Sequence, residues 1–161
     1  MKKKFDRKIL CWILGFISLA IELIVVRLNL TSLNVLTYLS AIGFFPAIIL
    51  FVTSLIYSSQ SRASKLGKYI ASIVCAIVFS VVLLVYCDVF ISKEIVDQII
   101  QNSISSDTTQ VSMNTATAGD NIQSILLYVA FSGLGCYIGT LVYKKKNKSV
   151  VDEETKLSEY D

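Results

Sequence analysis

Residues 69–91 read YIASIVCAIVFSVVLLVYCDVFI, a stretch of apolar and small side chains with a single formal charge, at Asp88. About 20 residues of α-helix cross the hydrocarbon core of a bilayer, because each residue advances the helix by about 1.5 Å. A helix also satisfies its own backbone hydrogen bonds where no water is present. This stretch is therefore predicted to be a membrane-spanning helix.

Three further runs have the same character, over residues 9–26, 35–57 and 122–143. The first of them contains only one charge, Glu22, and the other two contain none. Across the chain 54% of residues are hydrophobic and 17% are charged, against about 25% charged in ordinary soluble domains. The sequence therefore predicts an all-α integral membrane protein, a single domain in which four transmembrane helices form an antiparallel bundle.

Nearly all of the cations lie on one side of these runs, which predicts how the chain is oriented. Lys and Arg in short loops are retained on the cytoplasmic side of the membrane. The loop after the first run holds only Arg27, and the loop after the third run holds only Lys93. All other cations near the runs lie on the opposite side: Lys2, Lys3, Lys4, Arg7, Lys8, Arg62, Lys65, Lys68, Lys144, Lys145, Lys146 and Lys148. Both termini are therefore expected in the cytoplasm, with residues 144–161 as a cytoplasmic tail. The abundant lysine and isoleucine favour a bacterial cytoplasmic membrane.

The first run has an alternative interpretation. A basic start, an apolar stretch from Ile9 to Ile17 and the sequence Ser18-Leu19-Ala20 resemble a signal peptide with its cleavage site. The apolar run continues to Val26, which favours a retained membrane anchor. Cleavage would leave three spans with the same topology.

The connection over residues 92–121 is the longest one outside the predicted spans. Apolar side chains recur in its first part at helical spacing, at Ile95, Val96, Ile99, Ile100 and Ile104. This pattern predicts an amphipathic helix that extends the third span outward or lies on the outer membrane surface. Residues 105–120 are rich in Ser, Thr, Asn, Asp and Gly and have little to bury. Ile95, Ile99 and Ile100 are the candidate contacts to a partner from outside.

Small side chains line one face of each predicted span. Helices in lipid associate mainly by close packing, so small residues three and four positions apart indicate contact faces. They are Gly15, Ser18, Ser40, Gly43, Ala47, Ser72, Ala76, Ser80, Ser132, Gly135 and Gly139. The simpler interpretation is contact within one bundle, and the alternative is that one face binds another membrane protein. Pro46 is expected to kink the second span and free a backbone carbonyl near Ile42 and Gly43.

Glu22 and Asp88 are the only acids within the predicted spans. A carboxylate at the centre of a span costs at least about 2.5 kcal/mol, which by default suggests a function. Each lies within about 6 Å of the outer end of its run. Two interpretations stay open. One is an acidic pair, with Arg27 as counter-charge, that binds a cation or a basic partner, and the other is two partly solvated acids bonded to neighbouring helices.

Catalytic chemistry has little support in this sequence. It contains no histidine, and no lysine lies in a predicted span to serve as base for a Ser or Cys nucleophile. Cys11, Cys75, Cys87 and Cys136 all fall in apolar runs without a CxxC pair. They are interpreted as packing residues, and neither a metal site nor a cofactor is expected. The basic residues form no aromatic-interleaved patch of the kind that binds nucleic acid.

Two functions remain open. The first is a non-catalytic small membrane protein that binds another membrane or secreted protein, as an accessory subunit or as an immunity-type protector against a toxin or bacteriocin. Its partners would be the lipid bilayer, that second protein and, as a homo-oligomer, further copies of itself. The second is a small channel or transporter for an ion or solute, built on Glu22 and Asp88.

Overall fold

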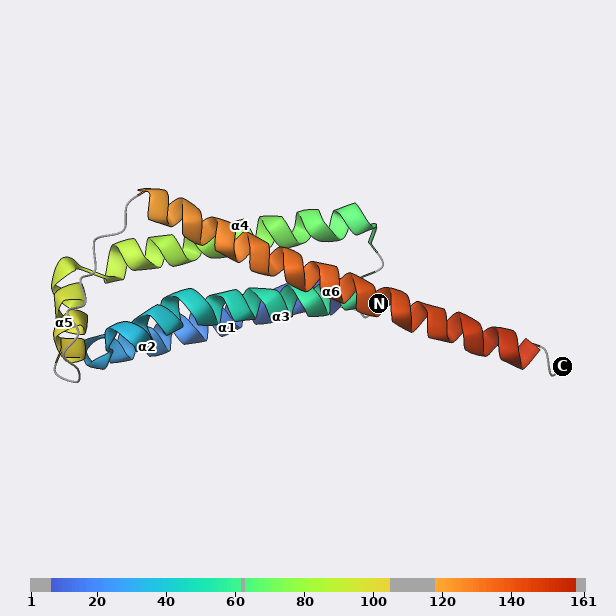
Figure 1. Cartoon of the computed structure of the whole chain (residues 1–161), viewed down its shortest axis with the longest axis horizontal. Helices are drawn as coiled ribbons and strands as arrows, with labels where there is room; N and C mark the ends of the chain where they lie inside the picture. The colour runs from blue at the N-terminus through green and yellow to red at the C-terminus, as the bar shows by residue number, and fades with distance from the viewer. Residues whose placement is uncertain (1–6, 62, 105–117, 159–161) are drawn as a thin grey trace, which may run out of the picture.

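The computed structural model of this chain describes residues 7–61, 63–104 and 118–158. Within those ranges every regular element is helical and no strand forms. Four segments are long and apolar enough to cross a bilayer: Ile9–Ser32, Val35–Gln60, Lys65–Phe90 and Ile122–Lys145. The predicted all-helical fold with four apolar helices is thus confirmed (Figure 1). This architecture is compatible with a multi-pass membrane protein.

The elements follow one another as four long helices with shorter helical turns between them. In chain order they are α1 (Arg7–Asn29), the 3-10 turn η1 (Leu30–Ser32), α2 (Val35–Leu39), the π-helical turn η2 (Ser40–Phe44), α3 (Phe45–Gln60), α4 (Lys65–Phe90), α5 (Lys93–Ile104) and α6 (Ala118–Ser158).

The helix α6 is longer than the predicted fourth span. It runs for 41 residues and continues to Ser158, well past the end of the apolar segment at Lys145. Figure 1 shows its C-terminal part extending beyond the other helices. The part of the long connection between 105 and 117 lies outside the described residues, as do Lys2, Lys3, Lys4 and Arg62.

Polar side chains set where two of the helices begin. The Asn34 side chain accepts the Thr37 backbone N–H at 2.8 Å, and the Asn34 N–H in turn donates to the Thr37 hydroxyl at 3.1 Å. This reciprocal capping box fixes the start of α2. The Ser64 hydroxyl accepts the Gly67 N–H at 3.1 Å and caps α4 in the same manner.

Pro46 changes the backbone at the start of α3. Because proline has no N–H, the carbonyl four residues earlier, at Ile42, loses its helical partner. The preceding residues form the π-helical turn η2, in which the Phe45 N–H donates to the Ser40 carbonyl. The Tyr128 hydroxyl of α6 donates to the Ile42 carbonyl at 2.8 Å. The carbonyl at which proline removes the helical donor is thus bonded to another helix.

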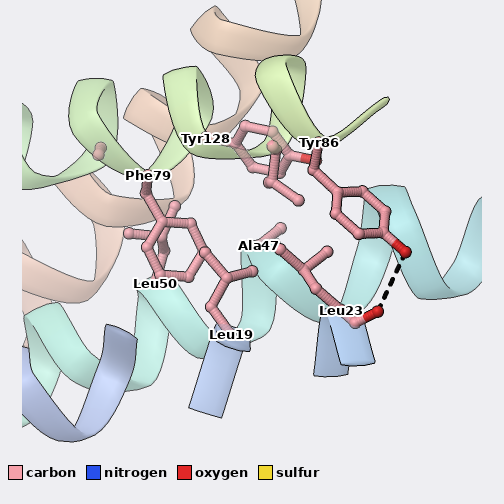
Figure 2. Packing of buried hydrophobic residues seen from close by; sticks show 9 residues of the cluster. Leu19, Leu23, Ala47, Leu50, Phe79, Tyr86 and Tyr128 are labelled. Atoms are coloured by element: carbon pink, nitrogen blue, oxygen red, sulfur yellow. Dashed lines mark hydrogen bonds between the residues drawn. The ribbon is translucent and has the colours of Figure 1, made fainter. Parts of the chain in front are cut away.

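The four long helices contact one another unequally. The most extensive contact joins α3 and α6, followed by α4 with α6 and then α1 with α3. The helix α1 meets α4 over a smaller area. The buried side chains at the centre are Leu19, Leu23, Ala47, Leu50, Ala76, Phe79, Leu83, Tyr86 and Tyr128 (Figure 2).

The outward faces of these helices remain apolar. Only 22% to 33% of the most apolar part of each long segment is buried inside the chain. Large Leu, Ile, Val and Phe side chains are exposed on all four segments. In water such a surface would be a severe aggregation hazard, whereas lipid covers it at no cost.

Candidate functional site

Glu22 lies deeper in its helix than the sequence predicts. Thirteen residues of the apolar segment Ile9–Ser32 precede it and ten follow it. Helical backbone continues past Val26 to Asn29 and then through the 3-10 turn to Ser32, residues that the sequence pattern assigns to a loop. Glu22 therefore lies close to the middle of this helical segment.

The Glu22 side chain is half-buried, but its two carboxylate oxygens are shielded and have no hydrogen-bond partner among the described residues. Both Oε1 and Oε2 are shielded from solvent. Buried polar groups in proteins are nearly always paired, so an unpaired acid requires an explanation. This is the one position in the described spans where a buried side-chain acid lacks a partner.

Two tyrosines border this region, and both of their hydroxyl protons are engaged elsewhere. The Tyr86 hydroxyl of α4 donates to the Leu23 carbonyl at 3.0 Å (Figure 2). The Tyr128 hydroxyl lies within electrostatic range of Glu22 but donates to the Ile42 carbonyl. A phenol has a single proton to donate. Neither tyrosine is therefore a donor to the Glu22 carboxylate.

The structure does not bring Asp88 to Glu22. The helices α1 and α4 meet at two side-chain contacts. Tyr86 donates to the Leu23 carbonyl, and Arg27 lies over the Phe90 ring at 5.2 Å from its centroid, so both contacts have the same spacing along the chain. This register places Asp88 about three residues, or about 4.5 Å, nearer the α5 end than Glu22. Asp88 is exposed, whereas the Glu22 oxygens are buried.

Arg27 does not neutralise Glu22 in this structure. Its guanidinium lies over the Phe90 ring, and the residue is exposed. A cation–π contact of this kind anchors the end of α1 to the end of α4. The predicted site of two acids and one counter-charge is thus reduced to one buried acid.

The helix α5 forms where the sequence predicts an amphipathic helix, and it lies across one end of the long helices (Figure 1). Its contacts are with η1 and α2. Of the three candidate partner contacts, Ile99 is 1% exposed and Ile95 and Ile100 are half-buried. Ile99 therefore packs within the chain and is not presented to a partner, because α5 turns its apolar face toward the connection between α1 and α2.

Hydrogen bonds hold α5 in this position. The Asn102 side-chain amide donates to the carbonyls of Thr31 at 2.9 Å and Leu33 at 3.0 Å. The Ser103 hydroxyl accepts the Val35 N–H at 2.8 Å. These bonds satisfy backbone groups where the chain turns between α1 and α2, and they hold α5 across this end of the helices.

Gly135 and Gly139 lie where α6 comes closest to α3. A Cβ atom added at Gly135 would lie 2.3 Å from the Phe51 carbonyl oxygen, and one added at Gly139 would lie 2.3 Å from that of Leu55. Only glycine permits so close an approach of two backbones. Gly15 has a similar role for α1, because an added Cβ there would meet the Thr53 side chain at 2.8 Å.

The other small residues divide into two groups. Ala47, Ala76 and Ser80 are buried between helices. Ser18 is exposed at the edge of an apolar groove of about 320 Å³ between α1 and α3. Gly43 would have no neighbour within 4 Å of an added Cβ. It lies in the π-helical turn, whose extra residue breaks the helical spacing on which its predicted contact depends.

Three buried serines link α3, α4 and α6. The Ser132 hydroxyl donates to the Ser72 carbonyl at 3.0 Å. Because its only proton is used there, Ser54 is the donor in the 2.7 Å contact between the Ser54 and Ser132 hydroxyls. Sequence reasoning identifies Ser72 and Ser132 as small residues but misses this bonding, which depends on three helices meeting at one height.

A buried lysine is the other feature that sequence reasoning misses. Lys68 is 2% exposed, its ammonium donates to the Ser58 carbonyl at 2.9 Å, and it lies 4.1 Å from the centroid of the Tyr143 ring. The cation thereby caps the C-terminal turn of α3, where carbonyls lack helical partners. No local sequence signal separates Lys68 from the exposed Lys65.

No three His, Cys, Asp or Glu side chains among the described residues are grouped to hold a metal ion. The four cysteines are free thiols, and Cys136 is buried. What the arrangement offers chemically is one buried acid and one docked, polar-faced helix. Comparisons with protein-family models, curated proteins and solved structures found no match to this chain.

Proposed function

We propose that this chain is a non-catalytic membrane protein that crosses the bilayer four times and binds another membrane or secreted protein through α5. The observation that carries this proposal is the docking of α5. Its apolar face and Asn102 are committed to the rest of the chain, while Glu94, Asp97, Gln98 and Gln101 are exposed.

A docked helix is a favourable binding surface for a physical reason. Ordering a loop or helix on binding costs free energy, and a surface that is already ordered avoids that cost. The exposed face of α5 is polar and carries two acids, Glu94 and Asp97, beside one cation, Lys93. It favours a partner with hydrogen-bonding and cationic groups over one with a purely apolar surface.

Photo-crosslinking tests this surface directly. A photoreactive amino acid at Gln98 or Gln101 is expected to give a discrete adduct of higher mass in native membranes, detected by immunoblot. The same amino acid at Val78, which is exposed on the apolar face of α4, is the matched control and should give none. An adduct of twice the chain mass would identify a second copy as the partner. Absence of any adduct at both α5 positions would remove the proposal.

The proposal includes an orientation in which α5 lies outside the cytoplasm and both chain termini lie inside. It is supported by the cations of the end opposite to α5, where Lys65, Lys68, Lys144 and Lys145 gather. A cysteine at Gln98 should react with a membrane-impermeant thiol reagent in intact cells. A cysteine at the exposed Ala63 should react only after the membrane is permeabilised, and the reverse pattern would contradict this topology.

The channel or transporter alternative is less well supported by this geometry. It depends on Glu22 and Asp88 acting together, and only Glu22 faces the interior. In the interior between the helices, the side chains of Leu19, Leu50 and Phe79 are almost completely buried and fill the space.

A further inference from the structure

No cation among the described residues pairs with Glu22, and the nearest one along α1, Arg27, lies within electrostatic range of Tyr86. The titratable neighbours of Glu22 from other helices are Tyr128 of α6, which lies within electrostatic range, and Tyr86 of α4, which bonds to the adjacent Leu23 carbonyl. Neither phenol can carry a positive charge. From α3 the neighbouring buried side chains are Ala47 and Leu50, which cannot ionise. The cation on the same helix, Arg27, is engaged with Phe90.

An ionised Glu22 would therefore be an uncompensated buried charge. Transfer of an isolated carboxylate into an apolar interior is so costly that the group binds a proton instead. The neutral acid needs only hydrogen-bond compensation, which is a much smaller requirement. The cost of this charge is the same whether or not α5 binds a partner.

We propose that Glu22 is a reversible proton-binding site within the helices, occupied by a proton at neutral pH in the conformation seen here. The ligand is a proton, and its acceptor is one of the two shielded Glu22 carboxylate oxygens. Asp88 is exposed near the end of α4 and does not share the site.

The position of Tyr128 links this site to the rest of the fold. Its hydroxyl bonds to the Ile42 carbonyl that Pro46 leaves free, and it lies within electrostatic range of Glu22. Ionisation of Glu22 would place a negative charge beside a phenol oxygen that is already polarised by its own donated bond. Loss of the proton is thus opposed by the contact between α6 and the π-helical turn.

Infrared spectroscopy of the full chain in lipid bilayers tests the proposal. The parent protein should show the C=O stretching band of a protonated carboxylic acid at neutral pH, with a downshift in D₂O. Glu22→Gln should lose this band, since the amide is neutral and nearly isosteric and the helices should remain folded. Asp88→Asn is the matched control and should retain it. Should Glu22→Gln fail to fold, Glu22→Asp should still shift the band in frequency.

Carbodiimide labelling gives an independent readout. Dicyclohexylcarbodiimide enters membranes and adds to protonated carboxylic acids, so at neutral pH it should modify Glu22, as mapped by mass spectrometry. Labelling should decrease as the pH is raised and should be lost in Glu22→Gln. Absence of both the band and the adduct in the folded parent would overturn the proposal. Protection of Glu22 by sodium at constant pH would also overturn it, by assigning the site to a metal cation.

Discussion

Gly139→Val is expected to push α6 away from α3 and to destabilise the folded protein by about 3 kcal/mol, at the upper end of the usual cost of overpacking. The reason is that an added Cβ at Gly139 would lie 2.3 Å from the Leu55 carbonyl oxygen and 2.9 Å from the Ser58 Cβ. A backbone oxygen cannot rotate away as a flexible side chain can, so the whole helix has to move. The free energy of unfolding in mixed micelles, measured by titration with a denaturing detergent, checks this expectation.

Gly133→Val is the matched control for this variant. Gly133 lies on the same helix but would have no neighbour within 4 Å of an added Cβ. Both substitutions make the same change in helix propensity and in hydrophobicity, so their difference isolates the contact with α3. Equal stability of the two variants would show that α3 and α6 do not approach one another as closely as described.

Lys68→Met is expected to destabilise the fold by about 2 kcal/mol, because hydrogen bonds to charged groups contribute about 1.5 to 3 kcal/mol. The substitution removes the bond from the ammonium to the Ser58 carbonyl and the cation–π contact with Tyr143. It keeps the length of the apolar stem, so little packing is lost. The same detergent titration measures the change.

Lys65→Met separates this effect from the loss of a cation near the membrane. Lys65 is exposed, lies three residues earlier in α4 and contributes the same charge at that end of the helices. We expect it to change stability by less than about 0.5 kcal/mol, as surface substitutions usually do. A loss for Lys65→Met as large as that for Lys68→Met would refute the capping role.

The broad architecture could be predicted from the sequence because it depends on properties of single segments. Length and apolar composition locate the four helices, and 3.6-residue periodicity locates α5. Pro46 indicates a free carbonyl at Ile42 because the missing N–H belongs to proline itself. The glycine spacing at Gly135 and Gly139 indicates a face that permits close approach, although it does not name the helix that approaches.

The sites could be predicted less well, since several of their features depend on the ends and faces of helices. Three residues after Val26 continue α1 and move Glu22 toward the middle of its segment. The extra residue of the π-helical turn removes Gly43 from the contact face. The docking of α5 on η1 and α2 buries Ile99 and leaves a polar surface in its place.

By itself the sequence determined that the chain forms four apolar helices and one amphipathic helix, since hydrophobic burial and backbone hydrogen bonding act on each segment independently of its neighbours. Only the tertiary structure decided that Glu22 faces inward without a partner while Asp88 faces outward, and that Lys68 is buried while Lys65 is not. Those outcomes depend on which faces meet, and that choice is the sum of many small contacts between segments far apart in the chain.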